Sequence, residues 1–167
     1  IHTEASATAK PGQFISIYTN DGTKLLPRPI SICEIDKENG NLRVVYRVTG
    51  ENTGTKQFSE LKAGDTIPVV GPLGNGFPLE KAEGKKAFLM GGGIGVPPIV
   101  QLAKELDCDK QAIIGYRDNN LFLKEDLELN LIILYIIKCI KFSKKITNIF
   151  LHLLGRCIVI MQSVMAI

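Results

Sequence analysis

The stretch Lys86-Ala87-Phe88-Leu89-Met90-Gly91-Gly92-Gly93-Ile94-Gly95-Val96-Pro97-Pro98 decides the fold of this 167-residue chain. An apolar run of strand length ends in four glycines, and two prolines then open a helical-looking segment, Ile99 to Leu106. A strand, a glycine turn and a helix are how an α/β domain presents backbone N–H groups to a phosphate. The stretch therefore predicts the start of a parallel α/β domain, although Pro98 stands where the usual fingerprint has its third glycine.

The residues ahead of this stretch have the pattern of short strands separated by turns. They predict a short helix from Thr55 to Leu61 with Thr55 as its N-cap, and strands over residues 13–18, 25–33, 42–48 and 66–70. Because Pro27 and Pro29 fall in the second strand, it should be an edge strand or be broken by a bulge. Many short strands at this spacing are typical of a small antiparallel barrel.

Residues 86–126 change character and predict a strand, a helix, a second strand and the start of another helix near Leu121. The fold class expected is therefore a β barrel plus α/β: a small antiparallel barrel, then the incomplete start of a parallel nucleotide-binding domain. Residues 1–126 carry fifteen basic and sixteen acidic side chains, whereas residues 127–167 carry five and one. The net charge of +3 thus belongs to the tail, and nothing in the rest indicates a nucleic-acid partner.

Residues 127–167 match neither preceding part, and two interpretations of this tail remain open. It has two apolar blocks, Leu131–Ile140 and Ile146–Ile167, and no proline. A membrane span needs about twenty apolar residues, which the second block barely supplies with Arg156 in its middle. The lack of acids and turn residues favours the interpretation that the tail is translated in a wrong reading frame. Such a tail should form poorly packed helices or expose an apolar patch. On that interpretation, deletion of residues 128–167 improves solubility.

The four cysteines are scattered, so they predict neither a metal site nor a redox pair; they are Cys33, Cys108, Cys139 and Cys157. Isolated reduced thiols are typical of a cytoplasmic protein. The opening residues have neither the basic start nor the apolar core of a signal peptide. We therefore expect a cytoplasmic location, and the missing initiator Met suggests a fragment of a longer protein.

Three motifs ahead of the glycine turn indicate a phosphate-bearing ligand with a flat ring. Arg28-Pro29-Ile30-Ser31 offers a guanidinium for a pyrophosphate and a hydroxyl for a heteroaromatic ring. Val45-Tyr46-Arg47 adds a ring that can stack and a positive charge, and Gly54-Thr55 offers N–H groups at a helix start. The third motif, Gly71 to Pro78, reads as a rigid turn that closes the barrel. Each alone is more often a solvated charge, a core ring or a connection, but together they favour a ligand.

In this order the motifs RPIS, VYR, GT, GPLGNGF and GGGIGVPP resemble the electron-transfer subunit of type B dihydroorotate dehydrogenase, in the ferredoxin–NADP reductase superfamily. The resemblance implies an FAD-binding barrel over residues 1–82 without its first strand, leaving an unpaired edge. It also implies an incomplete NAD-binding domain over 83–126, with 127–167 foreign to the family. The residues implied to hold FAD are Arg28, Pro29, Ile30, Ser31, Val45, Tyr46, Arg47, Gly54 and Thr55. Those implied to face the nicotinamide dinucleotide or the flavin edge are Gly91, Gly92, Gly93 and Gly95.

The family passes electrons between NAD and FAD, then through a [2Fe-2S] cluster to FMN in a partner subunit that oxidises dihydroorotate in pyrimidine biosynthesis. By resemblance the partners form a heterotetramer. This chain departs from the family in a loop, Gly50 to Thr55, that is two residues longer. The similarity ends near Asp126, and the cysteines that would ligate [2Fe-2S] are missing. We expect a truncated, impaired subunit, with no catalytic or metal-ligating residue assigned in this chain.

Two alternatives stay open. The small subunit of another flavin reductase, such as an NADH-dependent ferredoxin–NADP reductase, would share the barrel and the glycine turn. A non-enzymatic barrel tethered to a membrane by residues 131–167 is the other.

Overall fold

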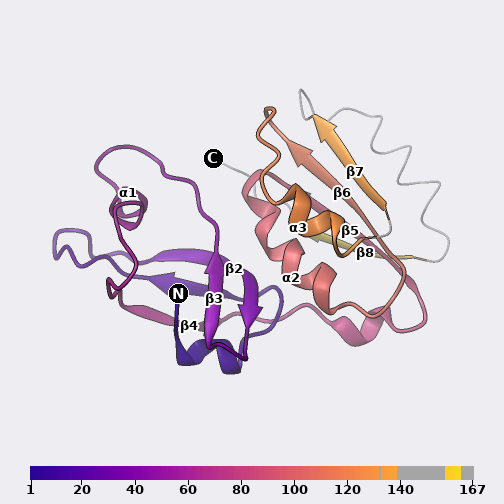
Figure 1. The fold of residues 1–167 in the computed structure, drawn as a ribbon, viewed down its shortest axis with the longest axis horizontal. Helices are drawn as coiled ribbons and strands as arrows, with labels where there is room; N and C mark the ends of the chain where they lie inside the picture. Colours follow the sequence, from indigo (N-terminus) through magenta and orange to yellow (C-terminus); the bar gives the residue numbers. More distant parts are fainter. Residues whose placement is uncertain (132, 139–156, 163–167) are drawn as a thin grey trace. The chain divides into compact units, whose positions relative to one another are not determined.

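A computed structural model of the chain describes residues 1–131, 133–138 and 157–162, the last two ranges as strand backbone (Figure 1). It divides into two compact units, Ile1–Phe77 and Pro78–Ile167, and each is described here by itself. The elements of the first unit are η1 (Glu4–Ala7), β1 (Phe14–Ile17), β2 (Arg28–Asp36), β3 (Asn41–Val44), α1 (Gly54–Phe58) and β4 (Val69–Leu73). Those of the second are η2 (Leu79–Ala82), β5 (Lys86–Gly92), η3 (Gly93–Gly95), α2 (Pro97–Glu105), β6 (Lys110–Tyr116), α3 (Lys124–Glu128), β7 (Ile133–Lys138) and β8 (Cys157–Gln162).

The first unit is built on a four-stranded antiparallel sheet in the order β3-β2-β1-β4. Ile15 and Ile17 of β1 are buried while Phe14 and Ser16 are only partly so, as the two-residue period of a strand requires. Ile32 and Leu42 join them in one core, which Phe58 of α1 also enters. The predicted antiparallel part of the fold is confirmed.

Strand β2 explains how two prolines fit inside a sheet. Its first half, Arg28–Ser31, pairs with β1, and its second half pairs with β3 from Ile32 onward, with an irregular register between Ile32 and Glu34. Pro29 therefore lies where β2 has a strand on one side only. The predicted edge character and the predicted bulge are both present, each in its own half of a strand that is internal in the sheet order.

Several predicted boundaries in the first unit are wrong. β3 ends at Val44, so Val45 to Val48 leave the sheet and are not the end of a strand. β4 begins at Val69 and continues to Leu73, later than the predicted 66–70. Residues 1–3 run along the outer edge of β3, and the expected edge left by a missing first strand stays a prediction. Leu42 N donates to Ile1 O at 2.8 Å, and Thr3 N donates to Gly40 O at 2.9 Å.

The loop between Gly71 and Phe77 is fastened to the segment before β1, as the rigid turn predicted. Phe77 N donates to Pro11 O at 2.8 Å, and Gln13 Nε2 donates to Gly74 O at 2.8 Å. A Cβ on Gly71 would lie 2.6 Å from Ile15 Cγ2, and one on Gly76 would lie 3.0 Å from Lys10 Cβ. These glycines are therefore required by packing.

The second unit contains a parallel four-stranded sheet in the order β7-β6-β5-β8. Helices α2 and α3 connect β5 to β6 and β6 to β7, as predicted for the start of a nucleotide-binding fold (Figure 1). Phe88, Leu89 and Met90 are consecutive buried residues of β5, which is typical of a strand inside a parallel sheet. Pro97 and Pro98 occupy the first two positions of α2, where their missing N–H groups cost nothing.

The tail differs from the expectation of poorly packed helices. Residues 133–138 form β7, which pairs with β6, and residues 157–162 form β8, which pairs with β5. Both segments are rich in Ile and other apolar residues, which suit the strands of a parallel sheet. They stand at the two ends of the described strand order. The helical expectation is therefore wrong for these two ranges. Residues 139–156 and 163–167, on which the rest of that prediction falls, lie outside the described residues, and the frame-disruption hypothesis stays a prediction.

Candidate functional site

Two of the predicted site residues, Arg28 and Gly54, meet in the first unit. Arg28 opens β2 and Gly54 opens α1, 26 positions later in the chain. A Cβ on Gly54 would lie 3.3 Å from Arg28 Nε and 3.0 Å from Thr19 Cγ2. Only a glycine lets the backbone of the first helical turn come this close to the guanidinium. The fold therefore brings a fixed positive charge and a helix start together.

The start of α1 carries free backbone donors. Within the part of the chain that the structure describes, the N–H groups of Gly54 and Thr55 donate to no acceptor, as expected of the first turn of a helix. The N-cap is Thr53 and not Thr55: Thr53 has extended backbone angles, and its hydroxyl accepts from Lys56 N at 3.2 Å. Thr55 Oγ1 instead accepts from Thr49 N at 3.1 Å, which ties the long loop 50–55 to the helix.

The second motif lies just after β3. Tyr46 is half-buried, and its ring meets Phe58 of α1 edge-on with centroids 5.9 Å apart. This burial raises the pKa of the Tyr46 hydroxyl. Val45 is also half-buried, whereas Arg47 is exposed. Tyr46 thus helps to seat α1, and its predicted contact with a flavin stays a prediction.

The rest of the Arg28–Ser31 motif has one open side. Ile32 N donates to Gln13 O at 3.0 Å. In an antiparallel ladder alternate residues face the same neighbour, so Ile30 faces β1 while Pro29 and Ser31 face away from it. Among the described residues no strand pairs with that side of Pro29, whereas the pairing with β3 begins beside Ser31, at Ile32. The open side of this motif is therefore at Pro29.

The predicted glycines of the second unit lie at the carboxyl end of β5. Gly91 and Gly92 end the strand, and Gly93 and Gly95 form the short η3 before α2. Gly93 has a φ of +52°, and a Cβ there would meet nothing within 4 Å. Since β6 lies on one side of β5 and β8 on the other, this turn is at the point where the strand order reverses. Open α/β sheets bind ligands at that point.

Sequence reasoning missed Asp21, which organises the loop next to Arg28. Its Oδ1 accepts from Thr23 N at 2.9 Å and from the Thr23 hydroxyl at 2.7 Å. Its Oδ2 accepts from Lys24 Nζ at 2.8 Å and from Gln57 Nε2 at 2.9 Å. These donors, Lys24 first, hold the pKa of the Asp21 carboxyl well below its usual range. The sequence Asn20-Asp21-Gly22 indicates a turn. The contact of Asp21 with Gln57 could not be predicted, because the two residues are 36 positions apart in the sequence.

Comparison with known families gives the first unit an identity. The family model described as the oxidoreductase FAD-binding domain matches residues 2–77. These residues are the first compact unit almost to its ends. Over residues 2–77 the first unit is therefore similar to oxidoreductase FAD-binding domains. The motifs that indicated a flavin domain are confirmed at the level of this family.

Curated relatives extend the similarity into the second unit. The chain is 44% identical over 125 residues to the electron transfer subunit of dihydroorotate dehydrogenase B (NAD(+)) from Streptococcus mutans, covering 72% of this chain and 47% of the relative. It is 45% identical over 127 residues to the same subunit from Streptococcus thermophilus, covering 74% and 49%. The predicted resemblance to this subunit is confirmed, and the chain spans about half the length of these relatives.

Solved structures support the same fold class. A structure of an NADH-dependent reduced ferredoxin-NADP oxidoreductase is 27% identical, with a TM-score of 0.75 over 95% of this chain and 60% of that one. The ferredoxin-NADP+ reductase from Plasmodium falciparum has a TM-score of 0.71 over 90% and 72%. At 18% identity, the second likeness concerns the fold alone.

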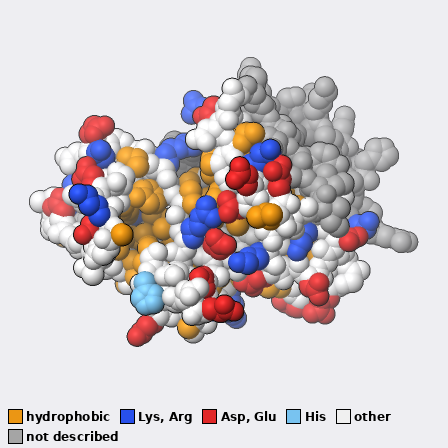
Figure 2. Space-filling view, in the orientation of Figure 1, with side chains coloured by type: hydrophobic (Ala, Val, Ile, Leu, Met, Phe, Trp, Pro, Cys, Tyr) orange, Lys and Arg blue, Asp and Glu red, His pale blue; other side chains and the backbone are white. Residues whose placement is uncertain are grey.

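The predictions on metals, charge and membranes can be compared with the structure only over the described residues. Over residues 1–131 and the two described tail strands, no three His, Cys, Asp or Glu residues gather to hold a metal ion. Cys33 is buried in β2 and Cys108 precedes β6; Cys139 lies outside the described residues, so the absence of a [2Fe-2S] cluster stays a prediction. On the face seen in Figure 2, acidic and basic side chains are interspersed. None of the described helices is long and apolar enough to cross a membrane.

Proposed function

We propose that this chain is the FAD-binding part of an electron-transfer subunit of an NAD-dependent dihydroorotate dehydrogenase. The observation that carries the proposal is the meeting of Arg28 with the start of α1, inside a unit that matches the FAD-binding domain family over residues 2–77. The identity of 44–45% to subunits of that name supports the choice of enzyme.

The residues present fit the pyrophosphate of FAD. Arg28 supplies a charge that cannot be deprotonated, and Gly54 and Thr55 supply free N–H groups beside it. Because residue 54 is a glycine, no side chain stands between its backbone and the Arg28 guanidinium. Pro29 and Ser31 would line the flavin ring from the side of β2 that faces away from β1, and Ile30 between them would hold the strand in place through its pairing with β1. Val45, Tyr46 and Arg47 would flank the ring. Bound FAD would accept a hydride and release single electrons.

NAD would bind at the glycine turn of the second unit. The side-chain-free surface of Gly92 and Gly93 suits a pyrophosphate at the reversal point of the strand order. Gly91 has a packing role, because a Cβ there would lie 3.1 Å from Gly95 O and 3.2 Å from Ile99 Cγ1. The proposed domain boundaries stay at 1–82, 83–126 and 127–167.

The names of the relatives describe a subunit of an enzyme. We therefore propose that the chain has an FMN-containing partner that oxidises dihydroorotate and that the two form a heterotetramer. We also propose a cytoplasmic location. A second candidate is a subunit of an NADH-dependent ferredoxin-NADP reductase, favoured by the TM-score of 0.75. Oxidation of dihydroorotate by the chain's natural complex would support the first candidate. Reduction of ferredoxin by a complex that does not oxidise dihydroorotate would support the second.

Replacement of Arg28 tests the flavin site. We expect the purified chain to take up FAD, and Arg28→Ala to weaken that binding by about 1.5–3 kcal/mol, because a hydrogen bond to a charged group is lost. Titration followed by flavin fluorescence measures this, with Arg43→Ala, a distant exposed arginine on β3, as the control. Equal FAD affinity of the wild type and Arg28→Ala would remove Arg28 from the site.

A further inference from the structure

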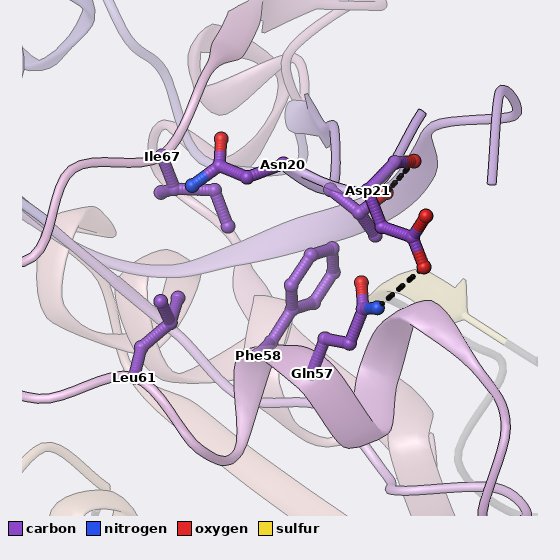
Figure 3. A pocket seen from close by; sticks show the side chains of 7 residues that line it. Asn20, Asp21, Gln57, Phe58, Leu61 and Ile67 are labelled. Atoms are coloured by element: carbon purple, nitrogen blue, oxygen red, sulfur yellow. Dashed lines mark hydrogen bonds between the residues drawn. The ribbon is translucent and has the colours of Figure 1, made fainter. Parts of the chain in front are cut away.

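The hydrogen bond between Asp21 and Gln57 joins two segments on which the proposed FAD site depends. Asp21 belongs to the loop between β1 and β2, and Gln57 belongs to α1. Gln57 Nε2 donates to Asp21 Oδ2 at 2.9 Å, across 36 positions of sequence. Figure 3 shows the Gln57 amide reaching from the helix to this carboxylate.

The loop side of this bond is rigid. Besides the bonds from Thr23 and Lys24 to the Asp21 carboxylate, the Thr19 hydroxyl lies 3.2 Å from both Asp21 O and Lys24 O. Thr19 is also the residue whose Cγ2 lies against Gly54. The loop is therefore a fixed support beside the start of α1.

The helix side, by contrast, cannot fix its own position. Helix α1 has five residues, and a helix this short is not stable by itself in water. Phe58 is its buried side chain, placed against Tyr46. Between the helix and the loop lies a pocket of about 240 Å³, lined by Thr19, Asn20, Asp21, Gln57, Phe58, Leu61 and Ile67 (Figure 3). Phe58 anchors the helix in the core, but side chains do not fill this pocket, and the Asp21–Gln57 bond at its lining joins the helix to the loop.

We infer that Asp21 is a positioning residue for the flavin pyrophosphate: through Gln57 it holds α1 so that the N–H groups of Gly54 and Thr55 stay beside the Arg28 guanidinium. Asp21 itself does not contact the ligand in this arrangement, since its two carboxylate oxygens are occupied by Thr23, Lys24 and Gln57. The inference rests on the proposed FAD site.

A swap of the two side chains tests this role in the full chain. Gln57→Glu places a carboxylate against the Asp21 carboxylate, so FAD binding should weaken by about three- to tenfold, the range of one hydrogen bond. Asp21→Asn combined with Gln57→Glu restores an amide-to-carboxylate bond with the donor reversed, although Lys24 Nζ loses its acceptor on residue 21. The double variant should therefore bind FAD more tightly than Gln57→Glu alone. Glu60→Gln, which removes an exposed ion pair between Lys56 of α1 and a residue just after the helix, is the matched control and should bind FAD as the wild type does.

Fluorescence titration with FAD and flavin-free unfolding followed by circular dichroism separate the outcomes. Wild-type chain that binds no FAD would refute the proposed function. If the wild type binds and Gln57→Glu binds equally well, the positioning role alone is refuted. A double variant that stays as weak as Gln57→Glu would also overturn it, and so would a loss of binding that only follows a loss of flavin-free stability.

Discussion

The chain has two glycine-rich loops that look alike in sequence and differ in what surrounds them. In Gly71–Phe77, of the first unit, three glycines each meet a neighbouring side chain at 3.1 Å or less from an added Cβ. In Gly91–Gly95, of the second unit, a Cβ on Gly92 would have Gly115 O as its nearest neighbour at 3.8 Å, and one on Gly93 would have none within 4 Å. The first loop needs glycine because the protein fills the space. In the second loop Gly91 is likewise packed, with Gly95 O 3.1 Å from an added Cβ, but the space beside Gly92 and Gly93 is open.

The largest effect expected from this comparison is on stability. Gly71→Ala should lower the free energy of unfolding of the first unit by about 1–3 kcal/mol, since its Cβ would overlap the buried Ile15 at 2.6 Å. Chemical denaturation of the full chain measures the change. Gly22→Ala is the control, because Gly22 has an ordinary φ and an added Cβ meets nothing within 4 Å. An unchanged denaturation midpoint for Gly71→Ala would contradict the packing role of the first loop.

The second loop should respond in binding. Gly92 has an extended backbone that alanine can adopt, at φ −145°. Gly92→Ala should therefore leave the unfolding free energy within about 0.5 kcal/mol, yet weaken NADH binding by about tenfold, or about 1.4 kcal/mol. Isothermal titration with NADH, beside a denaturation curve, gives both quantities. If stability falls while NADH affinity is kept, the two loops do not differ as described.

The smallest expected effect is a pH-dependent change in stability, which distinguishes the electrostatic role of Asp21 from the steric role of Gly71 in the first unit. The pKa of Asp21 is lowered in the folded state, so its contribution to stability is present above its ordinary pKa of about 3.9 and is lost as the pH falls below that value. We expect Asp21→Asn to be less stable than the wild type at pH 7, with the gap closing below about pH 4. Unfolding curves at several pH values test this, and Gly71→Ala should show no such convergence. A gap that stays constant with pH would contradict the charge-based role.

Local sequence features predicted the elements better than their partners. The glycine turn, the two prolines at the start of α2 and the alternation in β1 are encoded within a few residues, and the structure has them as expected. β8 pairs with β5 across 71 positions, as in Lys86 with Cys157, and no local pattern indicates that neighbour. The N-cap shifted from Thr55 to Thr53 because either threonine suits that role, and the choice depends on where the chain turns. Asp21 was missed because its function depends on Gln57, which only the fold brings near.

The first half of strand β2, which is paired on one side only, affects whether two copies of the first unit can associate edge to edge. A strand with one open side is a template on which another chain can extend the sheet. Pro29 lies on that side, at a position where any other residue would direct an N–H outward. The missing donor interrupts the ladder that an incoming strand would need. The proline therefore hinders a second copy of the chain from extending the sheet at this position.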